Sequence, residues 1–168
     1  MATPFNPQPT KPRPRLLFAV LVLLVLLLSL PASLRYLRDN HDLYLFSRAF
    51  IEDIPRRLGG PGRFRFILQP LVAITFGFRN GMGDARAGRP PYLRGLLLYR
   101  SQRGEFVRSS LAALSNILLM GILLDSICQW LILGASYPGA ALVVGPVLIV
   151  GPYAIARTLA NRAASLKQ

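Results

Sequence analysis

The chain alternates long apolar runs with shorter segments rich in arginine and proline. Three of the runs, residues 16–34, 111–133 and 139–156, are long enough to cross a bilayer. At about 1.5 Å per helical residue, the 19 residues of the first run extend about 28 Å, which matches a hydrocarbon core of about 30 Å. The pattern therefore predicts an all-α integral membrane protein with at least three transmembrane helices.

A fourth apolar run, residues 66–78, has only 13 residues and contains a Gln-Pro pair. Its length alone favours a re-entrant or interfacial element. The arginines favour a crossing: without one, all 14 arginines from Arg35 to Arg108 would lie outside, against the positive-inside rule. Snorkelling arginines can extend the run to residues 64–79, so we predict four transmembrane helices.

Between the first two runs, four apolar residues recur at helical spacing: Leu43, Phe46, Phe50 and Ile54. Arg48 and Glu52 form an i,i+4 pair on the opposite face. This pattern predicts a short interfacial amphipathic helix, capped by Asp39 or Asn40 and stopped by Pro55. Packing of the same helix against the transmembrane helices is an equally open alternative.

The two ends of the chain are basic. Residues 1–15 contain five prolines and three basic residues, which predicts a disordered cytoplasmic tail. Residues 158–168 are the second predicted cytoplasmic tail, and residues 16–157 form a single transmembrane domain. A cleaved signal peptide is the alternative for the first run, but its length and the lack of a good A-x-A site favour an uncleaved helix.

Composition narrows the functional classes. The chain is 52% hydrophobic and has 20 basic against 7 acidic residues, for a net charge of +13. Because the basic residues flank apolar runs and no nucleic-acid-binding motif accompanies them, we expect contact with anionic lipid headgroups and no nucleic acid. Cys128 and His41 are the only residues of their kinds, which leaves no disulfide, cysteine cluster or histidine-pair metal site. We therefore expect no cofactor, metal or catalytic site.

Asp125 is the most unusual polar residue, because a carboxylate near the middle of a transmembrane helix costs about 2.5–3.5 kcal/mol on insertion scales. Gly121 and Gln129 share its helical stripe. The stripe fits either a helix-packing contact or a proton or ion relay, and the absence of other acids from the predicted spans favours packing. Gln69 and Asn116 are the other intramembrane polar candidates, although Asn116 points away from Asp125.

The densest polar segment is residues 79–92, which contains six candidates for binding an anionic headgroup or ligand: Arg79, Asn80, Asp84, Arg86, Arg89 and Tyr92. Arginines beside flexible glycines can hold a phosphate. The segment is neither a Walker A loop nor a dinucleotide-binding fingerprint. The alternative is a turn at the membrane edge in which Asp84 pairs with Arg79 or Arg86, followed by an interfacial helix that begins at the Pro-Pro pair.

The last apolar run contains Gly145-Pro146 and Gly151-Pro152. Repeated Gly-Pro pairs occur at hinges and in the unwound, ion-binding helices of transporters. Proline is also common in membrane helices, so a static kink is the simpler interpretation.

Part of the sequence resembles a family of small uncharacterised bacterial integral membrane proteins. The resemblance covers roughly residues 66–157 and depends on Gln69-Pro70, Gly77, residues 79–81, 84–86 and 88–92, Leu124-Asp125 and Gln129. It implies the bacterial cytoplasmic (inner) membrane and brings with it no activity, cofactor or site.

The sequence thus favours a non-enzymatic accessory or scaffolding subunit that contacts anionic lipid and other membrane proteins. With four crossings, both termini lie in the cytoplasm. The support is indirect: the chain has few acids, no catalytic cluster and little mass outside the membrane, which leaves lateral helix packing. The alternative is a small transporter or channel component that uses Asp125, Gln129 and the Gly-Pro kinks.

Overall fold

The computed structural model describes residues 14–166, and within this range the protein is entirely helical, as predicted. Its elements are α1 (Pro14–Asn40), the 3-10 turn η1 (Tyr44–Phe46), α2 (Arg48–Glu52), α3 (Ile54–Gly59), α4 (Arg65–Arg86), α5 (Tyr92–Leu98), α6 (Arg103–Leu133) and α7 (Pro138–Ser165). Residues 1–13 of the predicted disordered tail lie outside the described range, whereas Pro14 and Arg15, predicted as part of that tail, begin α1. Residues 158–165, predicted as a tail, continue α7.

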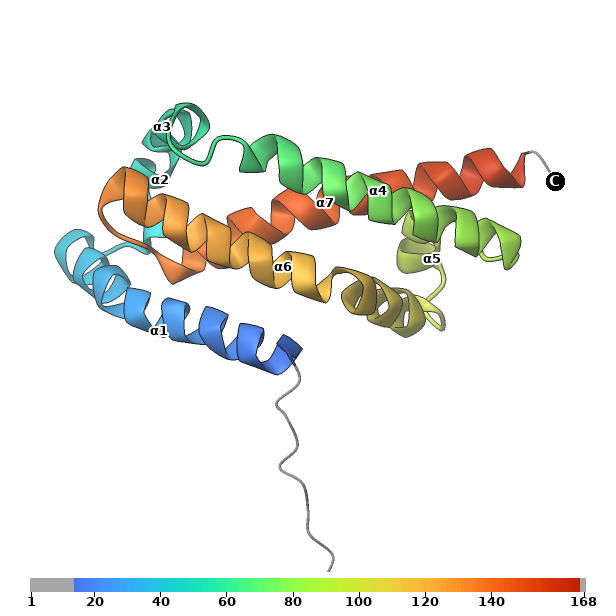
Figure 1. Ribbon diagram of the computed structural model, residues 1–168, viewed down its shortest axis with the longest axis horizontal. Helices are drawn as coiled ribbons and strands as arrows, with labels where there is room; N and C mark the ends of the chain where they lie inside the picture. Colours follow the sequence, from blue (N-terminus) through green and yellow to red (C-terminus); the bar gives the residue numbers. More distant parts are fainter. Residues whose placement is uncertain (1–13, 167–168) are drawn as a thin grey trace, which may run out of the picture.

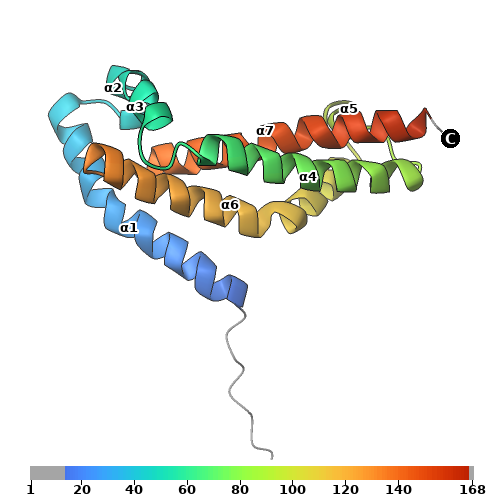
Figure 2. The same ribbon diagram turned by 45° about the horizontal axis from the view of Figure 1, so that its top comes forward.

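Four long helices alternate in direction (Figure 1). Helices α1 and α6 run one way, and α4 and α7 run the other way. The short elements η1, α2 and α3 lie at the end where α1 and α6 finish, whereas α5 lies at the opposite end. Figure 2 shows α4 and α7 side by side, α6 packed beside them, and α1 diverging from α6 toward its N-terminal end. The N-terminal end of α1 and the C-terminal end of α7 therefore point in the same direction.

Three helices of the described range, α1, α6 and α7, are long and apolar enough to cross a membrane. By this measure the prediction of four such helices is wrong. Helix α4 has sufficient length, with 22 residues, and extends beyond the predicted segment 64–79. It is not apolar enough, because Gln69, Arg79 and Asn80 lie within it, in addition to Arg65 at its start and Asp84 and Arg86 in its last turns.

The composition of α4 is explained by its contact with α7. Ala73, Gly77, Gly81 and Ala85 recur at intervals of four residues and are all buried. A Cβ atom at Gly77 would lie 2.5 Å from the carbonyl oxygen of Tyr153, and one at Gly81 would overlap the backbone of α7. Small residues at this spacing bring two helix backbones together, so α4 uses one face for helix contact and has few strongly apolar residues there.

Helices α6 and α7 also meet through glycine. A Cβ atom at Gly121 would lie 2.6 Å from Cδ1 of Ile149, and one at Gly145 would lie 2.8 Å from the Gly121 backbone. The absence of a side chain at Gly121 and Gly145 therefore allows α6 and α7 to approach closely. The neighbouring core is apolar and consists of Ala73, Leu114, Ile149 and Tyr153.

The predicted single amphipathic helix is wrong, because η1, α2 and α3 replace it. Helix α1 continues to Asn40, so neither Asp39 nor Asn40 caps the segment. Instead, the Ser47 hydroxyl accepts a hydrogen bond from the Phe50 amide at 3.3 Å and caps α2. Pro55 lies in the first turn of α3, where a missing amide proton costs nothing, and does not stop a helix.

The charged and apolar sides of this segment are nevertheless separated. The predicted pair of Arg48 and Glu52 is confirmed, with Nε and Oε1 2.9 Å apart. Leu43, Phe46 and Ile54 are exposed. These three side chains give this end of the bundle an exposed apolar surface in addition to the exposed charges of Arg48 and Glu52.

The Gly-Pro pairs do not unwind α7. The helix runs through Pro146 and Pro152 as one element, and this continuity supports a static role for the prolines. Cys128 is buried in α6 and unpaired within the described range, as expected of a small apolar residue.

Candidate functional sites: two buried charged clusters

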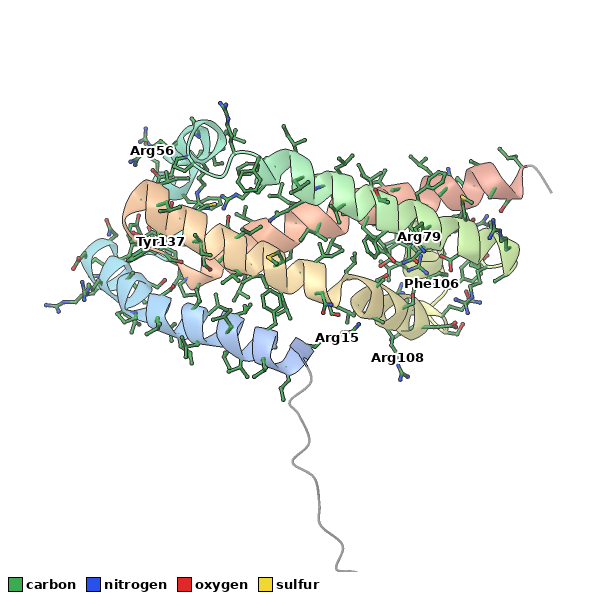
Figure 3. The ribbon with its side chains drawn as sticks, in the orientation of Figure 1. Arg15, Arg56, Arg79, Phe106, Arg108 and Tyr137 are labelled. Carbon is green, nitrogen blue, oxygen red and sulfur yellow. The ribbon has the colours of Figure 1, made fainter. Side chains whose placement is uncertain are left out.

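Two charged clusters lie inside the bundle, one near each end. We call the first the Asp125 cluster, and it consists of Arg57 (α3), Arg65 (α4), and Asp125 and Gln129 (α6). We call the second the Arg157 cluster, and it consists of Asp84 (α4), Ser109 and Ser110 (α6), and Tyr153 and Arg157 (α7). Figure 3 marks the two ends through Arg56 and Tyr137 at one and Arg79 and Phe106 at the other.

In the Asp125 cluster, one carboxylate meets two arginines. Nη2 of Arg65 lies 2.9 Å from Oδ1 of Asp125, and Nη1 of Arg57 lies 3.7 Å from Oδ2. The side-chain amide of Gln129 donates a hydrogen bond to Oδ2 at 2.6 Å. Each of these four residues is at most 2% exposed. Asp125 therefore joins α3, α4 and α6 through charge-assisted contacts in a region of low dielectric.

The cluster extends toward the loops. Nη2 of Arg57 donates to the Tyr44 hydroxyl at 3.2 Å, and that hydroxyl donates to Oδ2 of Asp53 at 2.8 Å. Oε1 of Gln129 accepts from the Tyr137 amide at 2.9 Å. The rings of Tyr44 and Tyr137 stack with centroids 3.8 Å apart. These contacts attach η1, α3 and the α6–α7 turn to the buried carboxylate.

Tyr44 is nearly inaccessible, with 5% of its surface exposed. Burial raises the pKa of Tyr44 to about 12, because the phenolate is poorly solvated there. Contact with the Arg57 guanidinium opposes this rise in pKa, and contact with Asp53 adds to it. Tyr44 is therefore a neutral hydrogen-bond donor at physiological pH.

The Asp125 cluster has more donors than acceptors. Nε of Arg57 and Nε of Arg65 have no hydrogen-bond partner within the described range. Two guanidiniums face the single carboxylate of Asp125, and the next acid, Asp53, is reached only through Tyr44. The chemistry of this surplus suits a water molecule or a small anion.

The Arg157 cluster is more completely paired. Nε and Nη2 of Arg157 donate to the two carboxylate oxygens of Asp84 at 2.6 and 3.0 Å, in a bidentate pair. Nη1 donates to the hydroxyls of Ser110 and Tyr153, both at 3.0 Å, and of Ser109 at 3.2 Å. Every nitrogen of the guanidinium thus has a partner, and one side chain joins α4, α6 and α7.

Aromatic rings enclose the same guanidinium. Its central carbon lies 4.7 Å from the ring centroid of Tyr92, 5.5 Å from that of Phe106 and 5.8 Å from that of Tyr153. Arginine stacks favourably on aromatic faces. Tyr92 begins α5, so the rings attach this short helix to the bundle.

The structure divides the six candidates of residues 79–92. Asp84 and Tyr92 are buried around Arg157, and Asn80 donates to the Tyr153 hydroxyl at 2.9 Å. The remaining three, Arg79, Arg86 and Arg89, are exposed. The segment is also not a loop as far as residue 86, because α4 continues to Arg86.

The expected pairing of Asp84 with Arg79 or Arg86 is wrong. Asp84 lies on the buried face of α4 and binds Arg157, and Arg89 reaches the same carboxylate at 3.7 Å. Arg89 also pairs with Glu105 of α6 at 2.7 Å. Arg79 and Arg86 therefore have no acidic partner among the described residues.

The four intramembrane polar candidates are also divided. Asp125 and Gln129 are buried and hydrogen-bonded to each other, and Gln69 is buried on α4, four residues after Arg65. Asn116 is exposed on another face of α6. The charged partners Arg57, Arg65 and Arg157 were not predicted from the sequence. Arg65 and Arg157 were interpreted as residues that flank apolar runs. The only available signal was their register, because each continues a four-residue stripe of its own helix: Arg65 with Gln69 and Ala73, Arg157 with Ile149 and Tyr153.

No family model, no curated protein and no solved structure matches the chain. Among the described residues, no group of three or more histidine, cysteine and acidic side chains is placed to hold a metal ion.

Proposed function

We propose that the protein is a non-enzymatic accessory or scaffolding subunit of a membrane complex, which contacts partner helices and anionic lipid. One observation carries the proposal: the buried charged groups join helices of this chain to one another, while apolar helix faces remain exposed. Such a molecule can bind partner helices through its apolar faces and anionic lipid through its positive charge.

Helix α1 supplies the largest apolar surface. Its exposed large side chains are Leu16, Leu17, Val20, Leu21, Leu23, Leu24, Leu27, Leu28, Leu30, Leu34 and Leu37. Val22 is its one buried apolar side chain. Figure 2 shows that the N-terminal half of α1 diverges from the bundle, so most of its circumference is available to lipid or to a partner helix.

The end of the bundle near α5 supplies the charge. Its exposed arginines are Arg79, Arg86, Arg89, Arg94, Arg100, Arg103, Arg108 and Arg162. The two acids nearby, Asp84 and Glu105, already pair with arginines. Each basic residue near an anionic membrane surface contributes about 1 kcal/mol of binding. By the positive-inside rule, we propose that this end faces the cytoplasm of a bacterium and that both termini lie there, in the inner membrane.

The proposal is tested by purifying the tagged full-length chain from its native membrane in mild detergent and identifying associated proteins by mass spectrometry. We expect a partner at a reproducible stoichiometry. Replacing Leu24 and Leu28 of α1 with alanine should weaken its retention, whereas the same change at Leu131, exposed on α6, should weaken it less. Recovery of the chain alone, even from cross-linked membranes, would contradict a scaffolding role.

A transporter or channel component is the second candidate, favoured by the unpartnered donors around Asp125. Two features weigh against it. Asp125 is held between two arginines, and the apolar core around Leu114 and Ile149 lies between the two charged clusters. The Asp125→Asn variant separates the candidates. Lost flux with intact assembly would favour transport, and lost assembly without measurable flux would favour scaffolding.

A further inference from the structure

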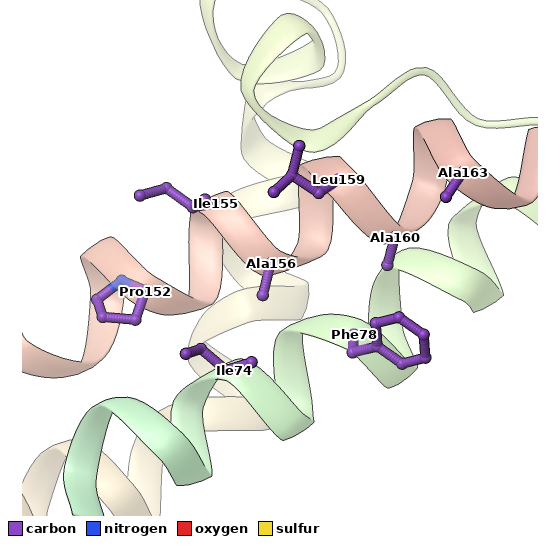
Figure 4. A pocket seen from close by; sticks show the side chains of 8 residues that line it. All are labelled: Ile74, Phe78, Pro152, Ile155, Ala156, Leu159, Ala160 and Ala163. Carbon is purple, nitrogen blue, oxygen red and sulfur yellow. The ribbon is translucent and has the colours of Figure 1, made fainter. Parts of the chain in front are cut away.

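A groove without polar side chains runs between α4 and α7 (Figure 4). Its volume is about 510 Å³. Ile74 and Phe78 line it from α4, facing Pro152, Ala156 and Ala163 on α7. The hollow exists because α7 presents small side chains opposite a phenylalanine. Its size lies within the range of about 300–1,000 Å³ that is typical of small-molecule sites.

The groove opens on the outer surface of the helix pair. Leu159 on its α7 side is 58% exposed, and Phe78 on its α4 side is 53% exposed. Helix α7 is one of the three helices apolar enough to cross a membrane. When α7 crosses the membrane, the groove on its outer surface faces the lipid. A ligand that enters from this side needs apolar surface, because the walls offer no hydrogen-bonding side chain.

Positive charge lies at one end of the groove. Arg162 directly precedes the lining residue Ala163, and Arg86 lies about two turns beyond Phe78 on α4. The two helices run in parallel, with Gly81 against Ala160, so both arginines reach the same end. Both are exposed, and neither forms a salt bridge with an acid among the described residues.

We propose that the groove between α4 and α7 binds one acyl chain of an anionic phospholipid, whose phosphate is bound by Arg86 and Arg162. An apolar chain with a single charged end matches an apolar groove that is charged at one end. Guanidiniums bind phosphate oxygens in bidentate geometry, which the headgroup supplies. The inference rests on the proposed contact with anionic lipid and gives that contact a defined site.

The test uses the delipidated full-length protein and native mass spectrometry, with phosphatidylglycerol and phosphatidylcholine as probes. We expect one phosphatidylglycerol to bind about tenfold more tightly than phosphatidylcholine. Ala163→Phe fills the groove, and Arg86→Gln with Arg162→Gln removes the charge. Each change should lower the phosphatidylglycerol affinity by about tenfold.

Matched controls separate a site from general attraction. Ala112→Phe places the same ring on an exposed position of α6, and Arg94→Gln with Arg100→Gln removes the same charge from exposed positions near α5. Both should retain the wild-type affinity. Because the two groove arginines are exposed and outside the core, their double variant tests the site even if Ala163→Phe fails to fold. Equal losses in the controls and the groove variants would overturn the proposal.

Partner proteins are measured in the same preparations. If Ala163→Phe displaces an associated protein while phosphatidylglycerol still binds, the groove is a helix-docking site and the lipid proposal is wrong. If no partner protein is found but phosphatidylglycerol binding depends on the groove, the scaffold proposal fails and the lipid site stands. The two proposals therefore fail through different measurements.

Discussion

Asp125 is the residue on which one end of the bundle depends. Its carboxylate is the only acid in direct contact with two arginines that are each at most 2% exposed. Removing one member of a buried ion pair leaves an uncompensated charge, which costs more than the pair contributes when intact. The burial of Arg57 and Arg65 thus depends on a single side chain.

Replacing Asp125 with alanine should therefore destabilise the protein strongly, by roughly 3–5 kcal/mol. Thermal or denaturant unfolding in detergent measures the loss. The exposed Asp39→Ala serves as the control and should change stability by less than about 0.5 kcal/mol. Adding Arg65→Met to the Asp125→Ala variant should restore part of the stability, because it removes one of the two stranded charges. Loss of stability in proportion to the number of replacements would contradict this account.

Replacing Arg157 with lysine separates the effect of hydrogen-bond geometry from the effect of positive charge. Lysine keeps the positive charge but cannot form the bidentate pair with Asp84 and at the same time reach Ser110 and Tyr153. Arg157→Lys should cost about 1–3 kcal/mol through the hydrogen bonds left unmade. The same replacement at the exposed Arg162 should be nearly neutral in an unfolding experiment. Equal melting temperatures for the two variants would show that only charge matters.

The ionisation of Tyr44 makes the stability of the folded protein depend on pH. Its pKa is raised to about 12 in the folded protein, from about 10 in an unfolded chain. The neutral phenol favours the folded state, so this contribution to stability is fully present below pH 10 and is lost as the pH rises through about 12. A phenolate absorbance titration of the wild type, compared with Tyr44→Phe, should show one tyrosine that ionises late. A difference curve with a midpoint near pH 10 would contradict the buried hydrogen-bonded position.

The contact between α4 and α7 depends on where glycine lies. Gly77 and Gly83 belong to the same helix, but a Cβ atom would meet the α7 backbone at Gly77 and nothing within 4 Å at Gly83. Gly77→Ala should destabilise the protein by about 1–3 kcal/mol through overpacking. Gly83→Ala should stabilise it by roughly 0.5–1 kcal/mol, because alanine is the better helix former. Unfolding experiments on this pair should give opposite signs, and equal signs would place the helix contact elsewhere.

The sequence predicted α1, α6 and α7 because uniform apolar length is sufficient for them. Helix α4 carries a mixed signal, since Ile67, Leu71 and Phe78 are exposed apolar residues while Gly77 and Gly81 face α7. Because its second face is small and polar, α4 is less apolar than α1, α6 and α7, and the prediction of a fourth equally apolar helix was wrong. The segment 43–54 was mispredicted for a different reason: its apolar periodicity is real, but Ser47 starts a new helix within it.

The candidate site was predictable only on one helix at a time. The shared stripe of Asp125 and Gln129 was visible in the sequence, and the structure places them side by side. Their charged partners were not, because sequence cannot distinguish an arginine that snorkels from one that turns inward. Arg63 and Arg65 stand two residues apart beside the same apolar run, yet Arg63 is exposed and Arg65 is 1% exposed.

At the scale of the whole molecule, the two ends of the bundle differ in charge and carry different loops. Asp42 is exposed at the end bearing η1, α2 and α3, whereas Ala87 and Leu166 are exposed toward the end bearing α5. The proposed orientation places the first end outside and the second in the cytoplasm. Helix α4 runs from one end of the bundle to the other beside α7. It therefore connects the end proposed to lie outside with the end proposed to lie in the cytoplasm.

Single cysteines at these three positions, in a Cys128→Ser background, test the orientation with a membrane-impermeant maleimide. Asp42→Cys should react in intact spheroplasts, and Ala87→Cys and Leu166→Cys should react only in inverted vesicles. The comparison of Asp42→Cys with Ala87→Cys is decisive, because α4 is the one long helix among the elements η1, α2, α3 and α4 that separate them in the chain. If both react from the same side, α4 does not carry the chain across, and the basic end loses its proposed contact with the cytoplasmic leaflet. Its arginines would then need a different anionic partner, since a charge of this density attracts counter-charge on either side of the membrane.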